Sequence, residues 1–342
     1  MPKRSVHETW PELDDDALLE LRMADLPLAI QGTLAQRTEQ LRGELHARGL
    51  TFPLHFYLSD EWFTPDGATA IAIPFYLAHP RLEKLEETQM LEVEGGEYEW
   101  CMRILRHEAG HAIDNAYRLR RRARRREIFG SPAEPYPEFY TPKPYSKSFV
   151  LHLDSWYAQS HPDEDFAETF AVWLTPNSQW EKRYHDWPAL KKLEYMDELM
   201  KEIGSQPPLV GKRATVDPLH RLRRTLRQHY KRKAEHYALD YPDFYDRDLR
   251  RLFPQPAEDA RTVPASRFIN RIRKEVRRTV SAWTGVYQYT IDQVLEEMAE
   301  RCDELQLRFV PGAEERTRAD FIVVLTVQTM NYLHSGRHRV AL

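Results

Sequence analysis

Apolar residues recur at helical spacing through most of the chain, with two short strand-like runs near the N-terminal third. Residues 13–49 intersperse leucines with charged side chains and are expected to be helical, with Gly49 at the C-terminal cap. The runs 51–58 and 68–75 are expected to be strands of a small sheet. Pro74 cannot donate a ladder hydrogen bond, which suits an edge strand. Such an edge could pair with an extended peptide, or it could simply end the core.

Helical patterns return in the middle of the chain. Residues 99–105 contain no proline or glycine, and the apolar stripe continues beyond them, so one helix is expected there. The stretch 130–144 is rich in proline and aromatic residues and is expected to be a loop that could frame a cleft. A second helix is expected to start at Pro162 with three acidic residues and to end at Pro176. A further amphipathic helix is expected over residues 180–203.

The chain beyond Gly204 is expected to be largely helical. Residues 205–211 resemble a linker, residues 219–239 a basic helix, and residues 254–264 a connection to two or three long helices. We therefore expect three parts: an N-terminal helical segment at 1–50, a domain at 51–204, and a helical C-terminal domain at 205–342.

Composition narrows the class of protein. The 342 residues are 42% hydrophobic and 30% charged, with a mean hydropathy of −0.67, which is typical of a soluble globular protein. No apolar run is long enough for a membrane span, and no apolar segment follows the charged start, so neither a membrane partner nor a signal peptide is expected. Cys101 and Cys302 are too few for a disulfide framework or a thiolate zinc cluster. This cysteine usage favours the cytoplasm.

Charge is negative overall and locally uneven. The net charge of −4 and the pI of about 6.4 argue against a nucleic-acid partner. Basic residues nevertheless gather in three stretches, Arg118–Arg126, 219–233 and 267–278. The simpler interpretation of the first stretch is a solvated face at a helix end, where cations complement the helix dipole. A patch for an acidic peptide, an acidic partner or phosphate is the alternative.

The segment His107-Glu108-Ala109-Gly110-His111 has the HExxH pattern within the first central helix. Residues four apart lie on one helix face, so the two imidazoles can hold one Zn²⁺. The glutamate beside the first histidine can then act as general base on a metal-activated water. The alternative is a pair of core histidines on a buried helix.

A catalytic zinc usually has a third protein ligand. The metzincin pattern requires glycine at position 114 and histidine at position 117, and this chain has Asp114 and Tyr117 instead. Asp114 shares a helix face with both histidines, so it could ligate, orient a ligand histidine, or join a buried hydrogen-bond network. Glu164 and Glu168 lie four apart on the second helix. One of them could ligate while the other bonds a ligand histidine, although a lone glutamate at a helix start can simply stabilise the dipole.

Two segments together carry a resemblance to a known family. They are His107-Glu-Ala-Gly-His-Ala-Ile-Asp-Asn115 and Asp163-Glu-Asp-Phe-Ala-Glu-Thr-Phe170. They resemble the gluzincin metallopeptidases of the anthrax lethal factor and Mlc titration factor A (MtfA) type, and bacterial zinc-binding metallopeptidases. The resemblance covers about residues 98–175. It implies a zincin-like catalytic domain with a small sheet that has an edge strand, an active-site helix and a second ligand helix. Together with the helical C-terminal domain expected from the residues after Gly204, which depart from these relatives, this predicts an α+β, predominantly helical fold.

The resemblance also implies roles for particular residues. It assigns the third zinc ligand to Glu164, beside His107 and His111, and makes Glu168 a neighbouring carboxylate that supports the site. In that group a tyrosine seven residues before the ligand glutamate stabilises the oxyanion of the tetrahedral intermediate. Residue 157 of this chain is a tyrosine, so Tyr157 takes that role by resemblance.

These observations predict a cytoplasmic zinc metallopeptidase that hydrolyses peptide bonds in a peptide or protein substrate, with Glu108 as general base. One alternative is a zincin-fold binding or scaffold module without peptidase activity, although the chain keeps Glu108. Another is a peptidase acting on nucleic-acid-associated proteins, which the three basic stretches suggest. The sequence indicates no oligomeric state.

Overall fold

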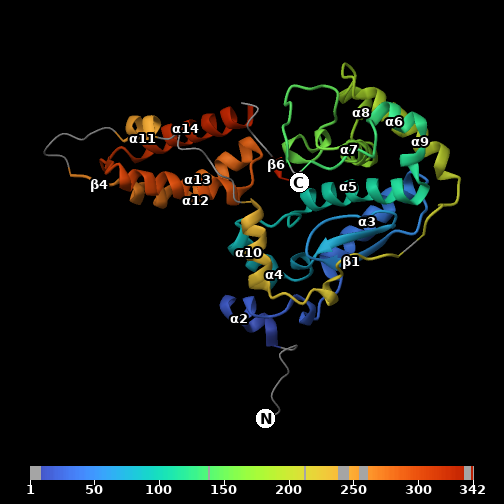
Figure 1. The fold of residues 1–342 in the computed structure, drawn as a ribbon, viewed down its shortest axis with the longest axis horizontal. Helices are drawn as coiled ribbons and strands as arrows, with labels where there is room; N and C mark the ends of the chain where they lie inside the picture. The colour runs from blue at the N-terminus through green and yellow to red at the C-terminus, as the bar shows by residue number, and fades with distance from the viewer. Residues whose placement is uncertain are drawn as a thin grey trace, which may run out of the picture. The chain divides into compact units, whose positions relative to one another are not determined.

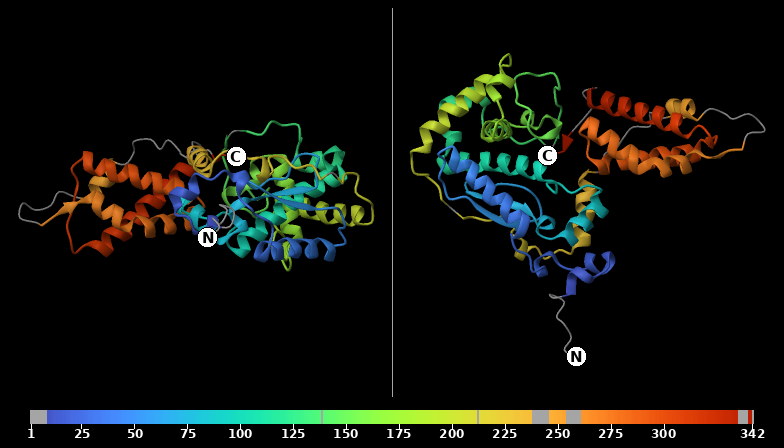
Figure 2. Two further views of the ribbon diagram at one scale, coloured as in Figure 1. Left: turned by 90° about the horizontal axis from the view of Figure 1, so that it is seen from below. Right: turned by 180° about the vertical axis from the view of Figure 1, so that it is seen from behind.

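The structure is a computed structural model that describes residues 9–137, 139–211, 213–237, 246–253, 261–334 and 340–341. The chain divides into two compact units (Figures 1 and 2). The first comprises Met1–Gln89 and Val93–Lys231, with Leu342, and the second comprises Met90–Glu92 and Arg232–Ala341. Residues 238–239 of the expected basic helix and residues 254–260 of the expected connection lie outside the described ranges.

The first unit is mostly helical. Its α-helices are α2 (Asp15–Leu19), α3 (Gly32–Ala47), α4 (Pro80–Met90), α5 (Tyr98–Tyr117), α6 (Ala123–Phe129), α7 (Pro162–Leu174), α8 (Trp180–Arg183), α9 (Leu190–Gly204) and α10 (Leu226–Tyr237), the last of which continues past Lys231. Its 3₁₀ helices are η1 (Trp10–Glu12), η2 (Met23–Asp25), η3 (Phe75–Ala78), η4 (Leu119–Arg121), η5 (Asp154–Gln159) and η6 (Leu219–Arg221). Its strands are β1 (His55–Ser59), β2 (Ala70–Pro74) and the two-residue β3 (Phe139–Tyr140).

Strands β1 and β2 form a small parallel pair. Their register runs from His55 opposite Ala70 to Ser59 opposite Pro74, and every residue of β2 is buried. The Ala72 amide donates a 2.8 Å hydrogen bond to the carbonyl of Phe63, away from β1. The chain itself therefore covers the outer edge of β2 at Ala72, and a peptide cannot pair there without displacing Phe63.

Helix α5 is the centre of the first unit. It packs against α7 on one side and against α3 and β2 on the other (Figure 1). A Cβ atom on Gly110 would lie 2.7 Å from the Cα of Ala167 in α7, which no real Cβ tolerates. Glycine at this position therefore lets the two helix backbones approach closely, and this close approach brings α7 up to the face that carries His107 and His111.

The arginine run is not the solvated end of α5 that the sequence suggested. Helix α5 ends at Tyr117, because Arg118 takes a left-handed conformation with φ of 52°, and the following arginines belong to η4 and α6. Arg125 is completely buried, where it contacts carboxylates of α5 and α7. The helix-end interpretation is therefore wrong for this residue, which lies in the core.

The second unit is a group of long helices. Its elements are α11 (Asp246–Leu252), β4 (Val263–Pro264), α12 (Ala265–Thr284), α13 (Gln288–Glu304), β5 (Arg308–Phe309), α14 (Glu314–His334) and β6 (Val340–Ala341). Helix α12 packs against α13 and α14, and β4 pairs antiparallel with β5. Buried apolar residues such as Phe268, Leu295 and Phe321 form its core. The expected long helices after residue 264 are present, and the chain is predominantly helical with a small sheet.

Within the described residues, no helix combines the length and the apolar content that crossing a bilayer requires.

Candidate metal centre

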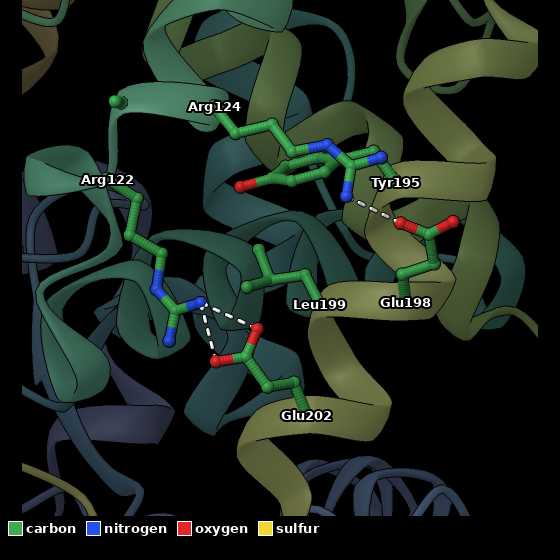
Figure 3. A pocket seen from close by; sticks show the side chains of 7 residues that line it. Arg122, Arg124, Tyr195, Glu198, Leu199 and Glu202 are labelled. Atoms are coloured by element: carbon green, nitrogen blue, oxygen red, sulfur yellow. Dashed lines mark hydrogen bonds and ion pairs between the residues drawn. The ribbon is translucent and has the colours of Figure 1, made fainter.

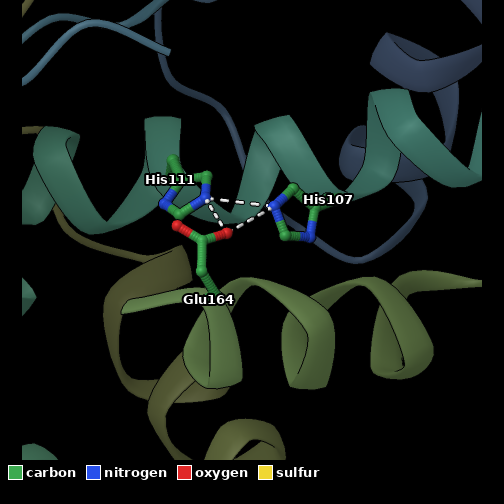
Figure 4. A group of neighbouring side chains, drawn as sticks. All are labelled: His107, His111 and Glu164. Carbon is green, nitrogen blue, oxygen red and sulfur yellow. Dashed lines mark hydrogen bonds and ion pairs between the residues drawn. The ribbon is translucent and has the colours of Figure 1, made fainter. Parts of the chain in front are cut away.

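Two histidines of α5 and one glutamate of α7 converge on a single point (Figure 4). The Nε2 atoms of His107 and His111 lie 3.1 Å apart. Oε2 of Glu164 lies 3.0 Å from Nε2 of His107 and 3.1 Å from Nε2 of His111. The i, i+4 spacing on α5 puts both rings on the face that α7 covers, and Glu164, in the first turn of α7, reaches them from the other side.

The donor atoms of this group suit a zinc ion. Imidazole nitrogen and carboxylate oxygen are zinc ligands, and in a tetrahedral site with bonds of 2.0–2.1 Å neighbouring ligand atoms lie about 3.3 Å apart. The three separations of 3.0 to 3.1 Å are close to that value. A small outward movement of the side chains would therefore make room for the ion.

Glu168 orients His107 through the ring nitrogen that faces away from the other two side chains of the group. Its Oε1 lies 2.8 Å from Nδ1 of His107, and its Oε2 accepts a 2.8 Å hydrogen bond from the Leu153 amide. A carboxylate opposite Nδ1 holds the ring proton there, so Nε2 presents its lone pair to the centre of the group. Both residues are buried, so this orientation is protected from solvent.

The charges of this group of side chains favour a bound cation. Burial lowers the pKa of His107, but hydrogen bonds to Glu164 and Glu168 outweigh it and raise that pKa well above its usual value. Burial likewise opposes ionisation of Glu164, yet the neighbouring His111 and His107 hold its pKa well below normal. A metal cation would take the place of these protons, because metal ligands bind in their deprotonated forms.

Glu108 lies beside the group without joining it. Its carboxylate is buried, and its Oε2 accepts a 2.8 Å hydrogen bond from the hydroxyl of Thr64. Its negative charge contributes to the raised pKa values of His111 and Tyr157. Thr64 lies in the loop between β1 and β2 and belongs to no sequence motif, so its contact with Glu108 is not predictable from local sequence.

Tyr157 lies on η5 and faces the same group. The centre of its ring is 5.5 Å from that of His107. Burial, reinforced by Glu164 and Glu108, raises the pKa of Tyr157 well above its usual value, so the hydroxyl keeps its proton. The two preceding residues, Ser155 and Trp156, have φ values of 55° and 54°, a costly conformation for non-glycine residues that often occurs near functional sites.

Tyr136 is a second tyrosine at the group, and the sequence had not singled it out. Its hydroxyl donates a 2.7 Å hydrogen bond to Oε1 of Glu164. Its ring stacks on His161 with centroids 3.8 Å apart and an interplanar angle of 16°. Its position in the proline-rich loop was the one sequence feature that could have indicated Tyr136. That loop was expected to frame a cleft, but the pattern did not distinguish one residue within it.

Asp114 belongs to a different group of side chains. Its Oδ2 accepts a 2.9 Å hydrogen bond from Nη2 of Arg125, and its Oδ1 accepts one of 2.8 Å from the Arg120 amide. The same guanidinium nitrogen lies 2.6 Å from Oδ1 of Asp163. In the described part of the chain, no hydrogen bond joins Asp114 to His107 or His111. Asp114 is therefore part of a buried hydrogen-bond network, which is one of the three roles predicted for it from the sequence.

A hollow of about 420 Å³ lies elsewhere in the first unit, between α6 and α9 (Figure 3). Two arginines line it, and each contacts a carboxylate of α9: Arg122 pairs with Glu202 at 2.8 Å and Arg124 pairs with Glu198 at 2.7 Å. The lining residues include no member of the histidine group. Because both guanidinium groups already have anionic partners, this hollow gives little support to an anion-binding patch.

Comparison with known proteins supports one class of protein. Residues 80–185 match the sequence model of a family described as "Putative zinc-binding metallo-peptidase". The matched segment contains His107, Glu108, His111, Tyr157 and Glu164. No curated protein and no solved structure matches the chain. Together with the group of two histidines and one glutamate, the family match supports a zinc metallopeptidase.

Proposed function

We propose that this protein is a zinc-dependent peptidase of the gluzincin type, with His107, His111 and Glu164 as the metal ligands. The observation that carries the proposal is the convergence of their three donor atoms within 3.1 Å of one another. In this proposal the HExxH helix, the second helix with its glutamate and the small sheet form a zincin-like domain, which the resemblance to the lethal factor and MtfA type implies. The family match over residues 80–185 supports the same class of activity.

The proposed reaction divides the work among the residues at the site. A zinc ion held by His107, His111 and Glu164 would supply Lewis-acid chemistry, polarising the scissile carbonyl and lowering the pKa of a water molecule. Glu108 takes a proton from that water as its oxygen bonds to the carbonyl carbon, and delivers a proton to the leaving amine nitrogen as the C–N bond breaks. Tyr157 donates a hydrogen bond to the carbonyl oxygen as that oxygen gains negative charge.

Thr64 orients the base in this scheme. Its hydroxyl bonds Oε2 of Glu108 at 2.8 Å and lies 3.0 Å from the Glu108 carbonyl oxygen. A carboxylate that is held through one oxygen atom presents its second oxygen atom to water. Thr64 thus fixes the orientation of the Glu108 carboxylate before substrate binds.

The role of Glu108 can be tested without disturbing the ligands. The substitution Glu108→Gln keeps the size of the side chain but removes the base, so we expect hydrolysis of a peptide library to fall by about 10²- to 10⁴-fold. Zinc content should not change. Glu99→Gln is the matched control, because Glu99 is an exposed residue in the first turn of the same helix.

Two outcomes would count against the proposal. Glu108→Gln with wild-type turnover would remove Glu108 from the mechanism. A zinc-loaded wild-type protein that cleaves no member of the library would favour the binding or scaffold alternative.

A further inference from the structure

The two carboxylate oxygens of Glu164 have different surroundings. Oε2 faces Nε2 of both His107 and His111, at 3.0 and 3.1 Å. Oε1 points to the other side and accepts the 2.7 Å hydrogen bond from the Tyr136 hydroxyl. We propose that Tyr136 is a positioning residue that reserves Oε1, so that Glu164 binds the metal through Oε2 alone. This inference rests on the proposed zinc site.

Tyr136 is held in place from the helix that carries Glu164. Its ring stacks on His161, which caps the N-terminus of α7 by accepting a 3.1 Å hydrogen bond from the Asp163 amide at Nδ1. Because Nδ1 accepts, the ring proton is on Nε2, which donates to the Glu134 carbonyl at 2.9 Å. The loop therefore contacts His161 twice, through the carbonyl of Glu134 and the ring of Tyr136, in addition to the Tyr136 hydrogen bond to Glu164.

These contacts couple the position of the loop to that of the ligand. His161 precedes Glu164 by three residues. A single helical turn therefore carries both His161, which stacks on Tyr136 and caps the helix, and the carboxylate of Glu164. The Tyr136 hydroxyl reaches Oε1 although the residue as a whole is half exposed. Glu164 itself is only 4% exposed, so water has little access to replace a lost hydrogen bond at this oxygen.

A hydrogen bond to a ligating carboxylate fixes its orientation and tunes the metal, and removing such a partner typically weakens metal binding by about 10- to 100-fold. Without the phenol, Oε1 is free to turn toward the metal, which would change a one-oxygen ligand into a two-oxygen ligand. Tyr136 thus keeps one coordination position open for water and substrate, as a catalytic zinc site requires.

The test uses Tyr136→Phe in the full chain, which keeps the ring on His161 and removes only the hydroxyl. Tyr145→Phe is the matched control, because Tyr145 directly follows the same proline-rich loop and is 89% exposed. Zinc affinity is measured by competition with a chromophoric chelator. We expect binding about 10- to 100-fold weaker for Tyr136→Phe and unchanged for Tyr145→Phe.

A second readout separates coordination from folding. The visible absorption spectrum of the Co²⁺-substituted protein reports coordination number, and we expect Tyr136→Phe to shift it toward higher coordination. A cooperative urea unfolding transition of the metal-free variant checks that the protein still folds. Zinc affinity within twofold of wild type together with an identical Co²⁺ spectrum would overturn the inference. Failure of the zinc site itself looks different, since the wild type would then bind no zinc.

Discussion

Two buried polar clusters lie between the same helices, α5 and α7, and they are neutralised in different ways. The arginine cluster consists of Asp114, Asp163, Arg120 and Arg125, and the histidine cluster consists of His107, His111, Glu164 and Glu168. In the first, two guanidinium groups face two carboxylates, with Arg125 bridging both. In the second, the two glutamates face imidazoles, and among the described residues no lysine or arginine forms an ion pair with either.

The difference separates a cluster whose charges balance within the chain from one that is suited to a cation. Guanidinium groups carry a permanent charge, so the arginine cluster has its cations built into the chain. Imidazoles are neutral or charged according to their surroundings and can present a lone pair to a metal. Buried carboxylates therefore indicate a metal site when their partners are histidines whose nitrogen atoms converge, and a structural ion pair when their partners are arginines.

The largest effect is expected from breaking the arginine cluster. Arg125→Met removes the completely buried guanidinium that contacts both carboxylates and leaves them with the partly exposed Arg120, so we expect the free energy of unfolding to fall by about 3–5 kcal/mol. Arg124→Met is the control, since that side chain is 61% exposed in a surface pair with Glu198, and should cost at most about 1 kcal/mol. Urea unfolding of metal-free protein measures both. Equal losses in the two variants would contradict the role given to Arg125.

His152 belongs to neither cluster and is a further buried histidine with which the two clusters can be compared. Nε2 of His152 lies 2.9 Å from the Arg103 carbonyl, and burial lowers the pKa of His152 to about 4. The folded state thus favours the neutral ring. The resulting contribution to the free energy of unfolding is fully present above pH 6.5, the ordinary pKa of histidine, and is lost as the pH falls toward 4. With about 1.36 kcal/mol per pKa unit, the loss is roughly 3 kcal/mol.

The variant His152→Gln keeps a donor for the carbonyl and removes the titration. We expect its stability to decline less than that of the wild type between pH 6.5 and pH 4 when both are unfolded by urea without metal. His185→Gln, at a side chain that is 79% exposed, should follow the wild type. Parallel curves for wild type and His152→Gln would show that His152 is not held neutral by burial.

The smallest predicted change concerns Glu168. Glu168→Gln keeps an acceptor for the Leu153 amide but weakens the hold on Nδ1 of His107, so we expect zinc affinity to fall by about 10- to 100-fold, or roughly 1.4–2.7 kcal/mol. Chelator competition measures this directly. A larger loss of zinc from Glu168→Gln than from Glu164→Gln would reverse the roles of the two glutamates.

Local sequence predicted the elements that carry the site. Helices α5 and α7 lie where the apolar spacing and the His161-Pro162 start placed them. The α-helical pattern expected over 13–49 is interrupted between Leu19 and Gly32, a segment that contains Pro27, and the pattern expected over 180–203 is interrupted between Arg183 and Leu190, a segment that contains Pro188. Proline disfavours the helical conformation in the residue before it, so both breaks had a local signal.

Other parts of the site depend on tertiary packing and left no local signal. Gly110 matters because Ala167 lies against it, and Arg125 is buried because it bridges Asp114 and Asp163. Thr64 reaches Glu108 from 44 residues away. Such partners are set by how helices and loops pack together, and spacing along the chain cannot report them.

The most direct test of the difference between the clusters is the zinc content of three proteins purified without added metal and analysed by plasma mass spectrometry. They are the wild type, Glu164→Ala and Asp163→Asn, which alter adjacent residues that belong to different clusters. We predict one zinc per chain in the wild type and in Asp163→Asn, and a clear reduction in Glu164→Ala. Absence of zinc from all three, or equal loss in both variants, would contradict a metal site built on Glu164.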